Sequence, residues 1–312
     1  MDLHLLENIT MIAQQGTISK AAEKLYITQS ALNQQLLKLE EDVGTPLFDR
    51  GGHRMTPTYA GRVYLESARK MLELKKKTYH IIRDIADGKR GEIHIAYTPE
   101  RGADQFAKTY PVFHAKYPDV TFVIHEERVK EMEKHLADGT VDIAHISIRQ
   151  PQPAFDYEWI DCEQMVLVVP RGNPLARKAE EAKGPGLPTL DPAWLAGEKI
   201  VLNSQETLMR DMVDDLYRQA GLKPDVLFET SSSKTIISVV ENGIAVGFVP
   251  QSYVVPSQKI VFFTAGHRYE WMLTVAHRRD YYLSNAEREF IRTFKEIYQA
   301  SRQDRQSATR VR

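Results

Sequence analysis

The sequence predicts an N-terminal all-α winged helix-turn-helix with a long linker helix, followed by a larger α/β domain. Short helical patterns separated by glycines fill the first 44 residues. An uninterrupted helical pattern then runs to Gly88, and strand patterns alternate with helices beyond Gly91. With 312 residues, the chain is long enough for two or three folding units.

Composition is typical of a globular protein, with 42% hydrophobic and 27% charged residues. No apolar run reaches the roughly 18 residues that span a bilayer, and the first residues do not resemble a signal peptide. We therefore expect a cytoplasmic protein with no membrane partner. The single cysteine, Cys162, excludes a disulfide within one chain and is expected to pack as a small apolar residue.

Three short helices are predicted in the first 44 residues. Leu6, Ile9 and Ile12 lie at helical spacing, and Gly16 ends that helix. Ser19 is predicted to cap a second helix over residues 20–25, with Glu23 completing a capping box.

The third helix is predicted over Gln29–Val43, between a Thr28 cap and Gly44. Leu36 and Leu39 would face inward, so that the polar side chains near the helix start remain outside. The small residues Ala21 and Ala22 would allow the close helix approach that a helix-turn-helix requires.

A wing and a long helix are expected next. Gly51 and Gly52 suit a tight hairpin within residues 49–56, and the helix begins at Pro57 or Thr58 and continues for about 45 Å. Its apolar seam predicts self-association, parallel or antiparallel, although packing on its own C-terminal domain is the alternative. The seam consists of Tyr64, Ala68, Met71, Ile82 and Ile85. Basic residues crowd this helix and the C-terminus, which an ordinary solvated face and tail also explain.

The remaining chain alternates strands and helices in two successive halves, which indicates a largely parallel sheet in each and a cleft between them. Strands are expected at residues 92–97, 120–125, 142–146, 165–169, 226–229 and 246–249. Helices are expected at residues 103–117 (interrupted by Pro111), 129–137, 208–220, 233–241 and 284–301.

Several motifs resemble the LysR-type transcriptional regulators. The match is dense where residues 16–32 read GTISKAAEKLYITQSAL, residues 39–50 read LEEDVGTPLFDR and residues 55–61 read MTPTYAG. It is looser at 136–144 (LADGTVDIA), 168–176 (VVPRGNPLA) and 240–250 (VENGIAVGFVP). The resemblance therefore extends over nearly the whole chain.

The resemblance implies a domain for DNA at residues 1–58 and a linking, dimerising helix at 59–88. It also implies an effector domain at 89–301 of the two-lobed, periplasmic-binding-protein-like type, and we expect a flexible basic tail at 302–312. Lobe I would comprise about 92–163 and 267–301, and lobe II about 164–266. The implied partners are double-stranded operator or promoter DNA, a small-molecule effector and a second copy of the chain, with a dimer-of-dimers tetramer as the family's assembly. RNA polymerase is a further candidate partner.

The polar side chains of the third helix have the donors and acceptors that base edges require, and basic side chains of the wing can reach phosphates. The candidate DNA-binding residues are Ser19, Thr28, Gln29, Ser30, Asn33, Gln34, Arg50, His53 and Arg54. Many relatives have an arginine where this chain has Gln34, and residues 1–57 hold slightly more acids than bases. We therefore expect an isolated DNA-binding domain to bind weakly and to depend on dimerisation.

Loops at the carboxyl ends of strands form clefts of this kind, and their neutral hydrogen-bonding groups suit a small organic anion. The candidate effector residues are Thr98, Glu100, Arg101, Ser147, Arg149, Asn203, Ser204, Thr207 and Phe248. Arg101 and Arg149 would supply the counter-charge. Each residue taken alone is explained equally well as an ordinary polar loop residue.

No catalytic motif, cofactor motif or metal-ligand spacing is found, so the histidines are expected in surface or core roles. Two other protein classes are the alternatives. A solute-binding protein would share the α/β lobes but leave residues 1–58 unexplained. A metabolic enzyme with a DNA-binding head would need a catalytic set in the cleft, and the sequence offers none.

Overall fold

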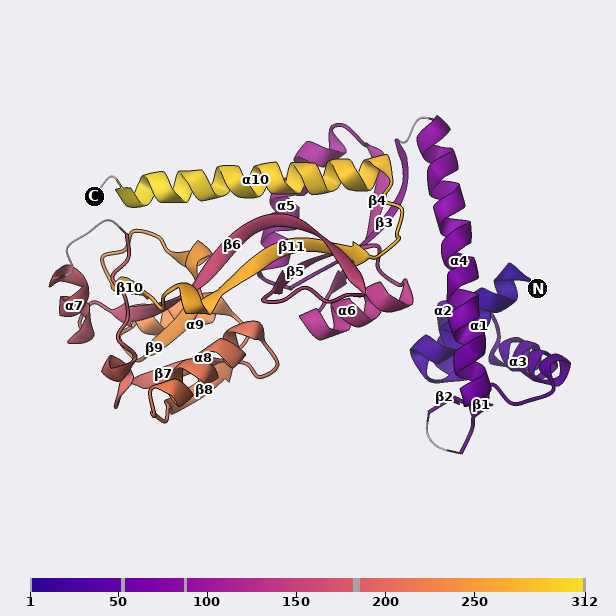
Figure 1. Ribbon diagram of the computed structural model, residues 1–312, viewed down its shortest axis with the longest axis horizontal. Coiled ribbons are helices and arrows are strands. Elements are labelled where there is room, and N and C mark those ends of the chain that lie inside the picture. The colour runs from indigo at the N-terminus through magenta and orange to yellow at the C-terminus, as the bar shows by residue number, and fades with distance from the viewer. Residues whose placement is uncertain (1, 52–53, 87–88, 182–185, 311–312) are drawn as a thin grey trace. The chain divides into compact units, whose positions relative to one another are not determined.

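A computed structural model describes residues 2–51, 54–86, 89–181 and 186–310. The chain divides into two compact units, Met1–Gly88 and Lys89–Arg312 (Figure 1). Among the described residues, no helix is both long and apolar enough to cross a membrane.

The first unit is a helical domain with a small hairpin. Its elements are α1 (Leu3–Gln15), α2 (Ile18–Lys24), α3 (Gln29–Val43), β1 (Phe48–Asp49), β2 (Thr56–Pro57) and α4 (Tyr59–Ala86). Ile9, Ile12, Leu32 and Leu36 are fully buried at its centre. Gly16 and Gly44 end α1 and α3 in the left-handed conformation, as predicted.

The start of α2 differs from the prediction. Thr17 is the N-cap, and its hydroxyl accepts a hydrogen bond from the backbone N–H of Lys20. Ser19 is exposed in the first turn instead, and Glu23 is too far along the helix to complete a capping box. Thr17 and Ser19 each have a hydroxyl, so their spacing alone did not distinguish which of them adopts the extended backbone that a cap requires.

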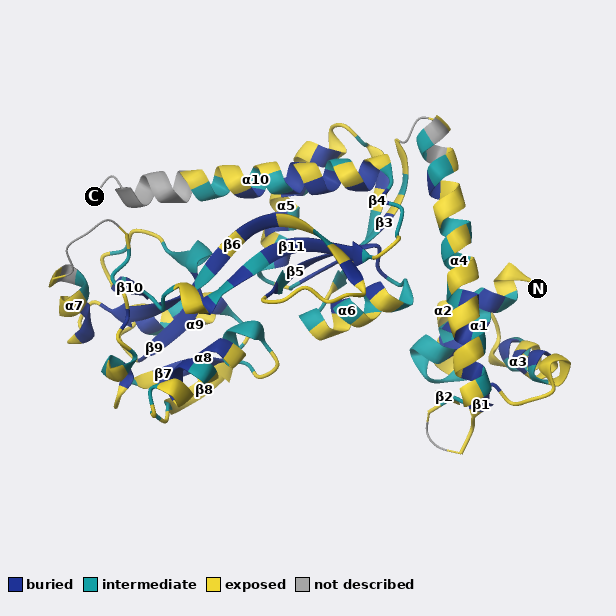
Figure 2. Cartoon of the chain, viewed as in Figure 1, coloured by how far each residue is buried: buried dark blue, intermediate teal, exposed yellow. Residues whose placement is uncertain are grey.

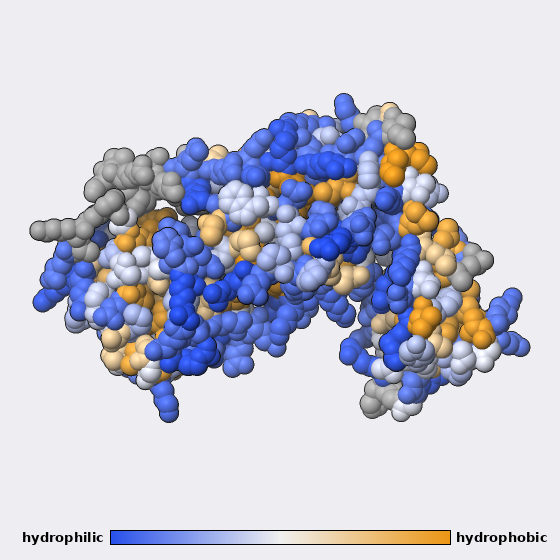
Figure 3. All heavy atoms as spheres, viewed as in Figure 1, coloured by the Kyte–Doolittle hydropathy of each residue, from blue (hydrophilic) through white to orange (hydrophobic). Residues whose placement is uncertain are grey.

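Only part of the predicted seam on α4 is free. α4 packs on α1 as far as Lys75: Ala68 is buried, Tyr64 is half-buried, and Lys75 pairs with Glu7 at 2.8 Å. Ala68 therefore belongs to the interior of the first unit and is not available for a dimer contact, because the apolar stripe at the start of α4 packs within that unit. Other apolar side chains of α4 reach the surface (Figure 3). Met71 is 40% exposed and Ile82 is 56% exposed, whereas the side chain of Ile85 lies outside the described residues.

The second unit is the predicted α/β domain with two lobes. Lobe I contains β3 (Arg90–Tyr97), α5 (Arg101–His114), β4 (Asp119–Glu126), α6 (Val129–Asp138), β5 (Ile143–Ile148) and α10 (Asn285–Arg310). Lobe II contains α7 (Leu175–Glu181), η1 (Pro192–Leu195), β7 (Lys199–Asn203), α8 (Leu208–Gln219), β8 (Asp225–Thr230), α9 (Ser233–Glu241), β9 (Val246–Pro250), η2 (Gln251–Tyr253) and β10 (Ile260–Thr264).

Two long strands connect the lobes (Figure 1). β6 (Phe155–Pro170) pairs with β11 (Glu270–Arg278) in lobe I and then with β9 and β10 in lobe II; η3 (His267–Tyr269) leads into β11. The hydrogen-bonded order is β4-β3-β5-β11-β6-β9-β7-β8. The sequence pattern predicts only the second half of β6, because its first half alternates polar and apolar residues irregularly.

Helices cover both faces of each lobe's sheet, and the central strands β5, β7 and β9 are largely buried, whereas the edge strand β8 is exposed (Figure 2). In lobe I, α5 and α10 cover one face around Phe113 and Phe290, and α6 covers the other with Met132 and Leu136. Pro111 lies inside a continuous α5, so the predicted interruption is wrong.

Cys162 does not pack as a small apolar residue. It is exposed on β6, and its thiol lies 3.9 Å from Oε2 of Glu270 on the neighbouring strand. Partial loss of hydration and the nearby carboxylates of Glu270 and Asp161 raise the pKa of the Cys162 thiol. Strand alternation explains the position, since Asp161 and Glu163 on either side point inward.

Candidate functional site

The N-terminal end of α3 presents a polar surface. Gln29, Ser30 and Gln34 are exposed, and Asn33 is half-buried. The hydroxyl of Thr28 accepts from the backbone N–H of Ala31 at 3.2 Å, which confirms the predicted cap. Ser30 lies 3.1 Å from that hydroxyl, so both oxygens are held at the helix start, where phosphate or base edges would be met.

The turn before α3 carries a residue that the sequence argument did not select. Tyr26 has a positive φ of 54° and is 96% exposed. Non-glycine residues adopt this backbone uncommonly. The tight connection between α2 and α3 imposes this backbone conformation. The conformation in turn directs the phenol of Tyr26 away from the domain.

The wing is anchored to α3 through Glu40. One oxygen of its carboxylate accepts from the backbone N–H groups of Leu47 and Phe48, and the other accepts from Arg50 at 2.7 Å. Arg50 is therefore partly neutralised by Glu40. Arg54 is exposed beside Gly16, and His53 lies outside the described residues.

In the second unit, Glu100 connects the lobes. Its carboxylate accepts from the backbone N–H groups of Ser233 and Lys234, at 3.0 and 3.1 Å, at the first turn of α9. The hydroxyl of Tyr253 donates to it at 2.7 Å. Burial, together with this bond to Glu100, raises the pKa of Tyr253, which keeps the phenol protonated as a donor. A lobe I carboxylate thus occupies the positive end of a lobe II helix.

The next residue, Arg101, is neutralised inside the protein. Its guanidinium donates to Glu163 on β6, whose side chain is 3% exposed, and the other oxygen of Glu163 accepts from the backbone N–H of Ser252 at 2.8 Å. Burial and the charge of Arg101 lower the pKa of His145 to about 3, so that this imidazole is neutral. Neither Glu163 nor Tyr253 could be selected from the sequence, because their partners Arg101 and Glu100 lie 62 and 153 positions away.

Comparison with known proteins decides the family. Residues 3–62 match the bacterial regulatory helix-turn-helix proteins of the lysR family, and residues 86–299 match the LysR substrate-binding domain. The chain belongs to the LysR family of transcriptional regulators. It is a DNA-binding regulator with an effector-binding domain rather than an enzyme.

Individual relatives of this LysR-family regulator are distant. The "Probable RuBisCO transcriptional regulator" of Cyanophora paradoxa is 27% identical over 80% of this chain and 76% of that protein. A full-length OxyR variant from Pseudomonas aeruginosa has a TM-score of 0.68 at 20% identity, covering 95% of this chain and 97% of that one. CbnR in complex with its target DNA has a TM-score of 0.52 at 22% identity, covering 96% and 100%. These solved structures support the fold.

The other candidate effector residues of this LysR-family protein are held separately. Thr98 accepts from the backbone of Gly102, Arg149 donates to the carbonyl of Arg268, and Thr207 caps α8 and donates to the carbonyl of Ser204. Further candidates differ in exposure: Ser147 is half-buried on β5, and Asn203 and Phe248 are buried at 5% and 0% exposure. The oxygen Oδ1 of Asn203 makes no hydrogen bond within the described residues.

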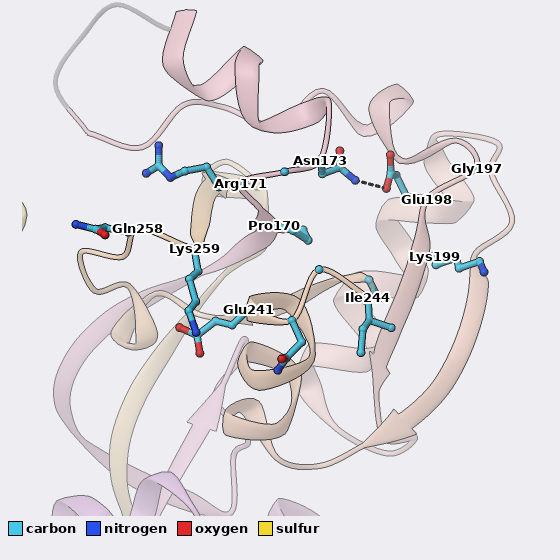
Figure 4. Close-up of a pocket in the computed structure, with 14 residues that line it drawn as sticks. Pro170, Arg171, Asn173, Gly197, Glu198, Lys199, Glu241, Ile244, Gln258 and Lys259 are labelled. Atoms are coloured by element: carbon cyan, nitrogen blue, oxygen red, sulfur yellow. Dashed lines mark hydrogen bonds between the residues drawn. The ribbon is translucent and has the colours of Figure 1, made fainter.

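A pocket of about 690 Å³ lies elsewhere in lobe II and includes none of the candidate effector residues (Figure 4). It lies between the loop after β6 and the C-terminal end of α9, and Asn173 donates to Glu198 on its wall at 2.8 Å. Lys199, which begins β7, borders it, whereas Asn203 ends the same strand. The pocket is therefore at the opposite end of the strands from the predicted effector loops.

Proposed function

We propose that this protein is an operator-specific regulator that reads base edges with α3 and is controlled by a small organic anion bound between the lobes of its C-terminal domain. The observation that carries the first part is the exposed polar end of α3 beside a wing anchored by Glu40. The observation that carries the effector part is that the Glu100 carboxylate accepts hydrogen bonds at the first turn of α9, which is therefore a place where a carboxylate is held.

The proposed DNA interface consists of the residues named from the sequence, with two distinct contributions. Gln29, Ser30, Asn33 and Gln34 supply amides and hydroxyls to bases, whereas Arg54 and, after release from Glu40, Arg50 contact phosphate. Ser19, Thr28 and His53 complete the proposed set. Dimerisation would place two such heads on two half-sites.

The proposed dimer uses the free part of the α4 seam. Met71 and Ile82 are exposed, and so are Leu74 at 65% and Tyr79 at 55%. Apolar side chains at this spacing on an otherwise basic helix need a cover, and a second copy of the helix supplies the same pattern. We propose residues 1–58 and 59–88 as DNA-binding and dimerising segments of a dimer, or of a dimer of dimers, with RNA polymerase as a further partner.

Replacing Gln29 or Asn33 by alanine tests base readout. Operators are first selected from a random DNA library with the wild-type protein, and affinities for base-substituted operators are then measured. Each variant should lose about 1–3 kcal/mol of discrimination at particular base pairs while its preference at other positions persists. Lys38→Ala, on the same helix, is the control: any loss of affinity that it causes should be the same for all operator sequences. Uniform weakening by the glutamine and asparagine variants would contradict base readout.

In the proposed effector site, the anion takes the place of the Glu100 carboxylate at the first turn of α9. An incoming carboxylate would compete for the N–H groups of Ser233 and Lys234 and so release the contact between the lobes. Arg101, Ser147, Asn203 and Ser204 remain the proposed polar surroundings, with Thr98, Arg149, Thr207 and Phe248 at the periphery. A ligand shifts the equilibrium between lobe arrangements only by its difference in affinity for them.

Glu100→Gln tests this competition. A panel of small mono- and dicarboxylates is screened by thermal shift, since ligands selective for the folded state raise the Tm. The carboxylates that bind should do so about three- to tenfold more tightly to Glu100→Gln, because the variant no longer places a charge at the helix start.

Glu158→Gln removes an exposed glutamate of β6 and should leave ligand affinity unchanged. Binding that is equal or weaker in Glu100→Gln would show that the anion does not replace this carboxylate. A wild-type protein that responds to none of the panel would contradict an organic-anion effector.

A further inference from the structure

Two histidines and a glutamate meet at one side of lobe I. His125 lies near the end of β4, Glu127 follows that strand, and His135 is on α6. One ligand atom from each, a ring nitrogen or a carboxylate oxygen, lies within 4.8 Å of the other two. The three residues come together only because α6 folds back over the sheet face on which His125 lies.

The polar atoms of this cluster lack satisfied hydrogen bonds. Nδ1 of His135 is 2.8 Å from Oε2 of Glu127. Yet neither atom, nor Nε2 of His125, makes a hydrogen bond of good geometry to any described residue, although all three atoms are buried. Buried polar atoms normally have partners, so three such atoms facing one another indicate a place suited to a cation.

The backbone around the cluster is fixed from both sides. The N–H of Glu127 donates to the carbonyl of Tyr97 on β3, and the carbonyl of His135 accepts from Val141 after α6. Met132 and Leu136, beside His135, are fully buried. Because the three ligand atoms already lie within 4.8 Å of one another, small side-chain rotations would bring them to the roughly 3.3 Å spacing of ligands around a tetrahedral zinc ion.

Other ionisable side chains surround His125. Burial lowers the pKa of His125; the imidazoles of His135 and His94 lower it further, while the carboxylates of Glu127 and Asp138 act in the opposite direction. His94 stacks on His125 at 6.4 Å but already pairs with Glu92 at 2.9 Å. His94 is therefore not counted among the proposed ligands, which are His125, Glu127 and His135.

We propose that His125, Glu127 and His135 form a binding site for a divalent transition-metal ion, with Zn²⁺ the ion that this donor set favours. Two imidazoles and one carboxylate suit zinc, and three protein ligands leave one coordination position open for water or another ligand. The side chains of Glu127 and His135 are about one quarter exposed, at 25% and 24%, so an ion can enter from solvent.

The site adjoins a contact between the lobes. Arg128 follows Glu127 directly, and both Arg128 and Lys130 lie 3.8 Å from Glu206 of lobe II. An ion that fixes Glu127 would also fix the start of α6 and its basic pair.

The proposal is tested by titrating untagged, chelator-treated full-length protein with ZnCl₂ in an isothermal titration calorimeter. The wild type should bind one equivalent of Zn²⁺ per chain. His125→Ala, His135→Ala and the shape-preserving Glu127→Gln should each lower the affinity at least about tenfold. Unchanged circular dichroism and tryptophan fluorescence would show that each variant is folded.

His267→Ala is the matched control, because His267 also pairs with a glutamate, Glu270, at 2.6 Å but has no second histidine beside it among the described residues. It should bind Zn²⁺ like the wild type. Failure of the wild type to bind one equivalent would overturn the proposal. So would affinities in His125→Ala and Glu127→Gln equal to that of the wild type, or binding lost only in His267→Ala.

Discussion

Gly61→Ala should strongly weaken specific DNA binding by distorting the junction between the wing and α4. A Cβ atom at Gly61 would lie 1.9 Å from the carbonyl oxygen of Leu47, which accepts the backbone N–H of Thr58 at 3.0 Å. The obstacle is backbone, so the helix must move rather than a side chain. We expect the first unit to lose about 3 kcal/mol of stability and the affinity for a selected operator to fall at least about tenfold.

The measurement is operator affinity together with helical circular dichroism during thermal unfolding. Gly172→Ala is the matched control, since a Cβ there meets nothing within 4 Å. All three tryptophans, Trp159, Trp194 and Trp271, lie in the second unit. Their fluorescence transition should therefore be the same in Gly61→Ala and the wild type. Wild-type operator affinity in Gly61→Ala would refute the steric argument.

Glu163→Gln should destabilise the effector domain by about 3–5 kcal/mol, because it leaves the guanidinium of Arg101 without its counter-charge. The side chain of Glu163 is 3% exposed and that of Arg101 is 21% exposed, so water replaces little of the lost interaction. The hydrogen bond from the backbone of Ser252 is weakened as well. Urea unfolding followed by tryptophan fluorescence measures the loss in this domain alone.

Two further variants separate charge from general damage. Glu296→Gln breaks an exposed pair with Arg292 on α10 and should change the free energy of unfolding by at most about 1 kcal/mol. Arg101→Met combined with Glu163→Gln should recover part of the stability, because no buried charge is left unpaired. A double variant as unstable as Glu163→Gln alone would assign the effect to packing instead.

Local patterns were sufficient for most of the helices and strands. α9 begins and ends where its periodicity and flanking residues predict, and α3 lies between the Thr28 cap and Gly44 as expected. Such features depend on residues only a few positions apart, so they can be predicted directly from the sequence. The predicted cap of α2 is wrong because Thr17 and Ser19 both have a hydroxyl, and the backbone conformation determines which of the two is the cap.

The candidate sites divide in the same way. The polar end of α3 follows from helical spacing, since residues three and four positions apart, such as Gln29 and Asn33 or Ser30 and Gln34, share a face. The pairing of Arg50 with Glu40, and of Arg101 with Glu163, joins residues 10 and 62 positions apart and changes which charges are free. Glu100 on the first turn of α9 and the His125–Glu127–His135 cluster likewise arise from long-range folding.

The sequence by itself therefore determined the order of the domains, their fold class and the helix expected to face DNA, because these depend on periodicity, caps and motifs within short segments. The tertiary structure decided which part of the α4 seam stays exposed, which charged groups neutralise one another, and which carboxylate occupies the start of α9. Those outcomes depend on packing between distant segments, where burial makes an unpaired charge costly and so selects its partner.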